Sequence, residues 1–414
     1  MSSDLAVSRV FVPGGNPTFT YVPRDAQQLE GHVTSYLRDR YKMLSVSGPT
    51  KTGKTVLLKN QIPNAIYLSG GSIATVGEFW ETLAEELGAE SETTLKSSQT
   101  TATGANTSAT LDIRVARATT GASAQGTSGT ETTRAWKTSA KASARTLLKE
   151  NPDTTIVIDD FHYIDPEVQL QIVRGLKDLV FNGTGLVVAA VPHRAYDVVR
   201  IEKEMTGRVS HLSVGFWDRE DLLEIPRRGF EKLNFSVTRE ISERLTEEAF
   251  QSPHLMQEFC RRMCYENGYE QGVADSPAKL DIADWNEFFR KLAPDTAKST
   301  FDILKRGPRQ RSDRLQRKLM DGTTGDIYEV VLRAIAATGP LTTMTYEQLR
   351  SQMKNVVVEA PQRHEVTRVL EQITELAKKQ EGEPVLEWDA ELSTLYVADP
   401  FFAYWLRWSE PSMA

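Results

Sequence analysis

The residues Gly48-Pro49-Thr50-Lys51-Thr52-Gly53-Lys54-Thr55 fit the phosphate-binding pattern G-x-x-x-x-G-K-[ST]. An apolar run at residues 43–47 precedes this stretch, and residues 55–59 after it are typical of a helix. Two glycines let backbone N–H groups approach phosphate oxygens, and a helix N-terminus adds partial positive charge at the same point. The stretch therefore predicts a phosphate-binding loop (P-loop) between a strand and a helix.

The P-loop predicts a nucleotide site with assigned roles. Lys54 would reach the β- and γ-phosphates of ATP, and the Thr55 hydroxyl would ligate Mg²⁺. ATP or ADP with Mg²⁺ is the expected cofactor. The expected nucleotide-binding residues of this segment are Gly48, Pro49, Thr50, Lys51, Thr52, Gly53, Lys54, Thr55 and Val56.

A second motif lies downstream, where residues 154–158 read TTIVI and are followed by Asp159 and Asp160. A run of this kind is typical of a buried parallel strand. Two adjacent carboxylates at its end would repel each other without a metal, which favours a functional interpretation. Asp159 would hold Mg²⁺, and Asp160 would orient or deprotonate the attacking water.

Three further catalytic candidates follow the acidic pair. The next apolar run, residues 185–191, ends near His193 and Arg194. P-loop ATPases sense the γ-phosphate or the attacking water at such a strand tip, so either residue could serve. Arg208 lies at the start of the strand expected at 207–214, where ring-forming P-loop ATPases carry an arginine finger. An ordinary surface arginine is the alternative.

Two positions outside the motifs are candidates for contact with the nucleotide. Arg24, with Tyr21 and Val22, lies in an entry segment of the kind that often covers the base, although ordinary packing is an equal alternative. Pro253 opens a helix whose first turn would face the phosphates.

Composition limits the other possibilities. The chain has 414 residues, a net charge of -7 and a pI of about 5.6, so it is expected to form several domains without a global nucleic-acid signature. Its two cysteines, Cys260 and Cys264, are too few for a disulfide framework or a four-ligand zinc site. No signal peptide or membrane-length apolar run is visible, and a cytoplasmic location is expected.

Two segments depart from the strand–helix alternation. Residues 91–145 are rich in Ser, Thr, Ala and Gly and predict an insertion, either a flexible loop or a β-hairpin that includes an alternating strand at 110–117. Near residues 305–318 lie the most closely spaced basic side chains, which could contact DNA phosphates or pair with acids of the same chain. They are Lys305, Arg306, Arg309, Arg311, Arg314, Arg317 and Lys318.

The chain resembles the STAND-type AAA+ ATPases. The resemblance rests on GPTKTGKT, on IVIDD and on the ending LYVADPFFAYWLRW at residues 395–408, which is similar to the close of the archaeal-type ATPase subfamily. It implies a nucleotide held between a sheet and a helical lid, slow hydrolysis and a conformational switch. In this family, bacterial members are often linked to signalling or phage defence. His254 stands where many relatives carry an arginine, so a charged second sensor is in doubt.

We therefore predict an α/β fold, with a doubly wound parallel sheet at 1–215, a helical lid at 216–300, a basic linker at 301–325 and a winged-helix domain at 326–414. The predicted function is an ATP-hydrolysing switch with a protein partner or self-assembly and no membrane. The alternative is an ATP-dependent DNA-binding regulator, resembling origin-recognition or transposition ATPases, that binds through 305–318 and the winged helix.

Overall fold

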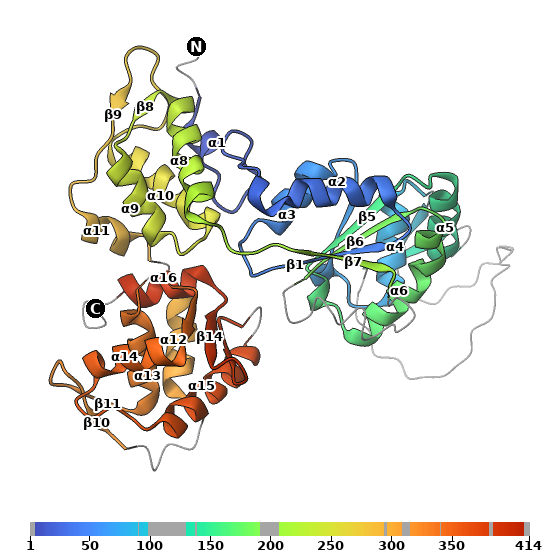
Figure 1. Ribbon diagram of the computed structural model, residues 1–414. Helices are drawn as coiled ribbons and strands as arrows, with labels where there is room; N and C mark the ends of the chain where they lie inside the picture. Colours follow the sequence, from blue (N-terminus) through green and yellow to red (C-terminus); the bar gives the residue numbers. More distant parts are fainter. Residues whose placement is uncertain are drawn as a thin grey trace, which may run out of the picture.

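The structure is a computed structural model. It describes residues 5–89, 139–190, 207–293, 296–308, 315–339, 341–380 and 384–409, together with the backbone of 91–97 and 130–136. Three regions can be followed in Figure 1: a sheet with helices on both faces, a helical region that follows it, and a C-terminal region.

A five-stranded parallel sheet lies at the centre of the first region. Its strand order is β2-β5-β6-β1-β7. The strands are β1 (Met43–Ser47), β2 (Ile66–Ser69), β5 (Thr155–Asp159), β6 (Gly185–Ala190) and β7 (Val209–Ser213). Because all neighbouring pairs are parallel, the carboxyl ends of the strands meet at one edge. The predicted doubly wound sheet is confirmed, and β6 separates the P-loop strand β1 from the acidic strand β5.

Helices cover both faces because alternate strand residues point to opposite sides. Met43, Ile156 and Leu186 face a core shared with α4 (Val76–Glu86), α5 (Ala140–Glu150) and α6 (Pro166–Phe181). The residues next to them along the strands, such as Leu44, Val157 and Val187, face a core shared with α2 (Leu29–Asp39) and α3 (Lys54–Gln61). Strands buried on both faces explain the continuous apolar runs in the sequence.

The insertion begins with a paired ribbon. Strands β3 (Ser91–Ser97) and β4 (Thr130–Trp136) are antiparallel, and Ser91 pairs with Trp136. They lie between α4 and α5 in the chain and agree with the hairpin interpretation of the insertion. The strand predicted at 110–117 lies outside the described residues.

The helical region after the sheet follows the pattern expected for residues 216–300. Its helices are α8 (Arg219–Leu233), α9 (Arg239–Glu248), α10 (Pro253–Glu266) and α11 (Trp285–Lys291), with the short strands β8 (Phe235–Ser236) and β9 (Ala278–Lys279). The N-terminal turn α1 (Val7–Val10) joins the same apolar core, as do Phe11 and Phe230. Both cysteines are buried on α10, and burial raises the pKa of each thiol.

The C-terminal region combines helices with a small antiparallel sheet, and its assignment as a winged helix stays a prediction. Strands β12, β14 and β13 form an antiparallel sheet in that order. The elements are α12 (Thr296–Arg306), β10 (Arg317–Lys318), β11 (Thr324–Gly325), α13 (Ile327–Ala337), β12 (Thr343–Thr345), α14 (Tyr346–Val356), α15 (Arg363–Lys378), β13 (Leu386–Asp389), β14 (Thr394–Val397) and α16 (Pro400–Trp408).

The helical and C-terminal regions share one hydrophobic core. Their boundary also has partly buried polar contacts: Glu248 accepts two hydrogen bonds from the Arg407 guanidinium at 2.7 and 2.8 Å, and a third from the Trp408 indole at 2.9 Å. The Tyr404 hydroxyl donates to the Phe289 carbonyl at 2.6 Å. Helix α16 therefore ties the two regions together, as its position between them in Figure 1 also shows.

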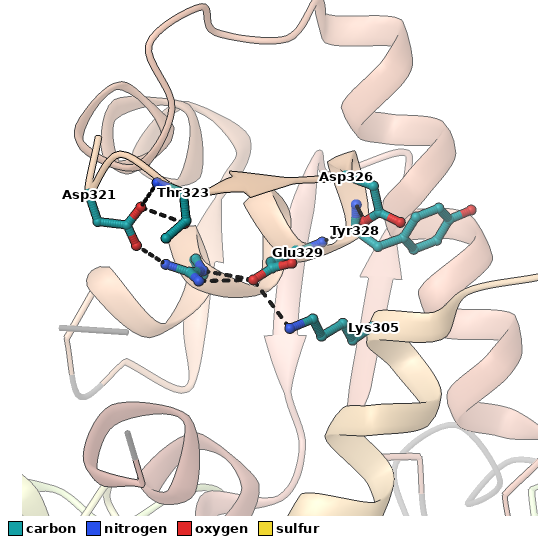
Figure 2. A network of polar contacts seen from close by, with 7 residues as sticks. Lys305, Asp321, Thr323, Asp326, Tyr328 and Glu329 are labelled. Carbon is teal, nitrogen blue, oxygen red and sulfur yellow. Dashed lines mark hydrogen bonds and ion pairs between the residues drawn. The ribbon is translucent and has the colours of Figure 1, made fainter. Parts of the chain in front are cut away.

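The basic stretch is not the linker that the sequence predicts from residue 301. Helix α12 continues to Arg306, because its apolar face packs into the C-terminal core through Phe301 and Leu304. Figure 2 shows Lys305 reaching Glu329 of α13, at 3.2 Å, in a network that also includes Asp321. Arg317 likewise pairs with Glu365 at 2.7 Å. At least two of the basic residues are therefore paired with acids within the chain.

No helix in the described ranges combines the length and the apolar character that a membrane span requires.

Candidate nucleotide-binding site

The P-loop occupies the turn between β1 and α3, at the carboxyl edge of the sheet. Its geometry requires both glycines. A Cβ at Gly48 would lie 2.1 Å from the Val214 carbonyl oxygen, which leaves no room for a side chain. Gly53 has a φ of 92°, in the left-handed region, and the space beside its Cα is open. The two positions explain why the pattern places glycine at each end of the loop.

Lys54 lies over the loop that precedes it. Its ammonium donates to the carbonyl oxygens of Gly48 at 2.8 Å and Pro49 at 2.9 Å, and the residue is only 8% exposed. The Thr52 hydroxyl also donates to the Pro49 carbonyl, at 2.8 Å. These bonds hold a positive charge at the mouth of the loop, where phosphate oxygens would bind.

The two sequence motifs meet through a side-chain hydrogen bond. The Thr55 hydroxyl donates to Asp159 Oδ2 at 2.6 Å, although the two residues are 104 positions apart. Among the described residues, no group of three or more His, Cys, Asp or Glu side chains could hold a metal by itself. A hydroxyl and a carboxylate nevertheless suit Mg²⁺, which takes its remaining ligands from phosphate and water.

Asp160 follows Asp159 in a left-handed conformation, with a φ of 52°. Partial burial and the neighbouring Asp159 carboxylate raise the pKa of Asp160 above its ordinary range, and the Lys54 ammonium partly opposes that rise. A carboxylate with a raised pKa is a better proton acceptor than a free aspartate. The sequence predicted this residue from its place after a strand.

A cavity of about 320 Å³ lies beside the P-loop. Lys54, Thr55 and Asp160 line it, so residues of both motifs open into a single space. The other walls come from the entry segment, from Trp217 and from the start of α10. Residues of these walls include Val12, Gly14, Thr20, Tyr21, Val22, Arg24, Leu29, Glu30, Trp217, Ile225, Pro253, His254 and Gln257.

Arg24 lines the cavity, and its guanidinium has partners within the chain, so contact with a nucleotide stays a prediction. It is 3% exposed, donates to the Gly215 carbonyl at 2.8 Å and stacks over the Trp217 ring at 5.1 Å. Burial lowers the pKa of Arg24. Tyr21, predicted with it, donates its hydroxyl to Glu30 at 2.7 Å.

Gln257 is a wall residue that sequence reasoning missed. Its buried amide donates to the Thr20 hydroxyl at 2.7 Å and accepts from the Val12 amide at 3.1 Å. It therefore fastens the entry segment to α10. Nothing in the sequence marks it, because a glutamine on an amphipathic helix is ordinarily exposed.

Pro253 and His254 bring the first turn of α10 to the cavity, and the predicted contact of Pro253 with phosphates stays a prediction. The Ser252 hydroxyl caps this helix by accepting from the Leu255 amide. The His254 ring lies edge-on to Phe401 with 4.8 Å between ring centroids. Burial lowers the pKa of His254, and the Lys51 charge lowers it further.

Arg208, another catalytic candidate, does not line the cavity. Arg208 lies at the amino ends of the strands, opposite the P-loop: its carbonyl accepts from the Met43 amide at 3.0 Å, and its guanidinium lies 5.7 Å from the Phe181 ring centroid. It does not act at this cavity, and a role toward another subunit stays a prediction. His193 and Arg194 lie outside the described residues.

No family model and no curated protein sequence matches the chain. Among solved structures, a Walker-type ATPase of Pyrococcus abyssi is similar at 12% identity and a TM-score of 0.53, over 93% of this chain and 96% of that chain. The Cdc6p protein of Pyrobaculum aerophilum is similar at 14% identity and a TM-score of 0.43, over 96% of each chain. The ORC2 protein of Aeropyrum pernix, titled as ADPNP-ADP complexes, is similar at 12% identity and a TM-score of 0.43, over 96% of each chain.

The first of these similarities establishes the fold, and the other two have TM-scores too low to support an argument. The chain has the P-loop ATPase fold. At this level of identity the shared property is the fold, and the chemistry has to be argued from the residues of the cavity.

Proposed function

We propose that the chain binds ATP with Mg²⁺ and hydrolyses it slowly, and that it works as a molecular switch of the STAND/AAA+ type. The observation that carries the proposal is the 2.6 Å hydrogen bond from Thr55 to Asp159. It joins a phosphate-binding loop to an acidic pair beside one cavity. Phosphoryl transfer needs this combination of positive charge, metal ligands and a water-orienting acid.

Each residue has a distinct part in the proposed reaction. Lys54 neutralises charge that develops on the β- and γ-phosphate oxygens. Thr55 and Asp159 would hold Mg²⁺, which supplies further charge neutralisation when bound. Asp160 accepts a hydrogen bond from the attacking water and aligns its oxygen with the γ-phosphorus. The raised pKa of Asp160 makes the carboxylate a suitable acceptor for the proton of that water.

The proposal of a switch rests on the shared core of the helical and C-terminal regions. Two regions with one core move together, so a nucleotide bound beneath α10 would affect both of them. We interpret the helical region as the lid and the C-terminal region as a winged helix, in agreement with the family resemblance. A cytoplasmic location and a protein partner remain predictions.

The test is ATP turnover by the purified chain. The wild type should release phosphate slowly, whereas Lys54→Ala and Asp160→Asn should each lower turnover at least about a hundredfold. Lys59→Ala is the matched control, because Lys59 is on the same helix, is exposed and does not line the cavity. Equal turnover in the wild type and both site variants would refute hydrolysis at this cavity. Tight binding without turnover would instead indicate a nucleotide-locked scaffold.

The alternative, an ATP-dependent DNA-binding regulator, stays a prediction. Lys305 and Arg317 are engaged with Glu329 and Glu365, which removes part of the charge that the alternative requires. The test is duplex binding at low salt by the wild type and by a variant with Arg309, Arg311 and Arg314 changed to Ala. Salt-dependent binding that this variant loses would favour the regulator over a switch without DNA.

A further inference from the structure

Trp217 lies in the connector (residues 214–218) between the last strand of the sheet, β7, and the first helix of the lid, α8. The residue is 8% exposed and forms part of the cavity wall. The connector presses on the P-loop: the Val214 amide donates to the Ser47 carbonyl at 2.6 Å, and the Val214 carbonyl fills the space beside Gly48. Trp217 is therefore a lid-side residue in direct reach of the phosphate-binding loop.

The indole of Trp217 holds one peptide group of that loop. Its Nε1–H donates to the Thr52 carbonyl oxygen at 2.9 Å in a buried hydrogen bond. The described residues contain no cis peptide bond, so the Thr52 carbonyl and the Gly53 N–H belong to one planar trans unit and point in opposite directions. When the carbonyl is fixed toward Trp217, the direction of the Gly53 N–H is fixed as well, and it points away from Trp217.

This constraint matters because Gly53 is conformationally free. With a φ of 92° and no side chain, Gly53 can adopt either sign of φ, so its own backbone does not fix the orientation of the peptide before it. The Thr52–Gly53 peptide could therefore turn its carbonyl toward the phosphates, where it would repel them. The hydrogen bond from the Trp217 indole to the Thr52 carbonyl oxygen prevents this peptide from rotating.

The tryptophan is itself held on two sides. The Arg24 guanidinium lies over the ring at 5.1 Å and is anchored by the Gly215 carbonyl. The Trp217 backbone amide donates to the Gln251 carbonyl at 3.2 Å, in the turn between α9 and α10. Phe250 and Gln251 in this turn have φ values of 48° and 55°, so the turn is strained and its geometry is specific. The position of the indole thus follows the position of the lid.

We propose that Trp217 is a positioning residue that orients the Gly53 N–H toward the phosphates and makes phosphate affinity depend on the placement of the lid. The inference rests on the proposed nucleotide site and adds a part of it that no motif contains. Phenylalanine would fill similar space and would still accept the Arg24 stack, but it has no N–H to donate. The role therefore belongs to one atom, Nε1.

The experiment compares ADP with adenosine by titration calorimetry, in wild-type protein and in Trp217→Phe. Loss of one hydrogen bond of this kind corresponds to a factor of about five to ten. ADP should bind the variant about five to ten times more weakly than it binds the wild type, and adenosine should change by less than about twofold. The control is Trp80→Phe, since the buried Trp80 indole has no hydrogen-bond partner in the described part of the chain. Trp80→Phe should leave both affinities unchanged.

The outcomes separate the two proposals. If the wild type binds ADP no better than adenosine, the proposed phosphate site itself is wrong. If the wild type prefers ADP and Trp217→Phe keeps the same preference, the role of Trp217 is wrong. Should Trp217→Phe not fold, wild-type protein labelled with ¹⁵N at its seven tryptophan indoles serves instead. One indole resonance should shift with ADP and not with adenosine, and the absence of such a shift would overturn the inference.

Discussion

The Lys51 ammonium, in the middle of the P-loop, lies 3.0 Å from the Asp399 carboxylate at the start of the last helix, 348 residues further along the chain. The same ammonium lies 4.1 Å from the centroid of the Phe401 ring. Phe401 also contacts His254 of α10. The C-terminal region therefore contacts the phosphate-binding loop directly, and a phosphate group that binds there has to share Lys51 with Asp399.

Asp399→Asn should strengthen nucleotide binding. The substitution leaves the Lys51 charge available to phosphate. The side chains of the pair are 32% and 23% exposed, and such a pair contributes at most about 1 kcal/mol, so we expect a gain in ATP affinity of about fivefold or less. The gain should shrink as salt increases. Calorimetry at two salt concentrations measures both effects, with the exposed Glu391→Gln as control. Weaker binding by Asp399→Asn would contradict this account of Lys51.

Thr55→Ala should remove most of the Mg²⁺ dependence of nucleotide binding. We expect chelation of Mg²⁺ to weaken ATP binding by the wild type at least about tenfold and to have much less effect on Thr55→Ala. The measurement is ATP affinity with excess Mg²⁺ and with excess EDTA. Thr146→Ala, on the exposed side of α5, is the matched control. An undiminished Mg²⁺ effect in Thr55→Ala would place the metal elsewhere.

Asp160→Asn should stabilise the nucleotide-free protein while it abolishes turnover. Because burial and Asp159 raise the pKa of Asp160 above 3.8, the folded state releases this proton less readily than the unfolded state. Ionisation of Asp160 therefore costs stability as the pH rises through the folded-state pKa. The variant should melt about 1–2 °C higher at pH 7, and the gain should disappear as the pH falls below the ordinary value of 3.8, because both states of the wild type then bind the proton. A lower melting temperature at pH 7 would contradict this origin of the pKa shift.

His254 should make the folded protein less stable in acid. In contrast to Asp160, this group binds its proton more readily in the unfolded state than in the folded state. Burial and Lys51 lower the pKa of His254 below 6.5, so the unfolded state binds its proton first as the pH falls. Stability from this group is present above pH 6.5 and is lost as the pH falls toward the folded-state pKa. The charged groups that face it are Lys51, Glu258, Arg261 and Asp399. Between pH 7 and pH 5 the wild type should lose more stability than His254→Gln in thermal unfolding, and parallel curves would refute the assignment.

Glu248→Gln should weaken the joint between the lid and the C-terminal region. The substitution removes the charge that accepts from Arg407 and Trp408 and leaves a partly buried guanidinium without its carboxylate. We expect a loss of about 2 kcal/mol of unfolding free energy, measured by urea denaturation. Glu247→Gln, one residue away and exposed, should change it by less than about 0.5 kcal/mol.

The sheet and its motifs could be predicted because their signals are local. Apolar runs at residues 43–47, 154–158 and 185–191 mark β1, β5 and β6, and β1 has the predicted bounds Met43–Ser47. The meeting of Thr55 with Asp159 also follows from sequence, since residues at the carboxyl ends of parallel strands share one edge.

The contacts around the cavity could not be predicted because they depend on how separate regions pack. Nothing in the sequence indicated that the Lys51 ammonium would contact the Asp399 carboxylate. The hydrogen bond from Gln257 to the Thr20 hydroxyl was equally unmarked. The linker predicted from residue 301 was wrong for a related reason: Lys305 and Arg306 suggested a solvated segment, while Phe301 and Leu304 buried the helix that carries them.

The shared core of the lid and the C-terminal region sets an order of events during synthesis. Val7, Val10 and Phe11 belong to that core, so the N-terminal turn packs only against helices that emerge after the whole sheet. The sheet region has its own two cores on either face and contains every strand that it needs. During synthesis the sheet region can therefore fold first. The N-terminal turn can pack only after α8 and α10 have left the ribosomal exit tunnel. Residues 7–11 and the elements from α8 to α16 thus form one folding unit, and the phosphate-binding region is inserted within it.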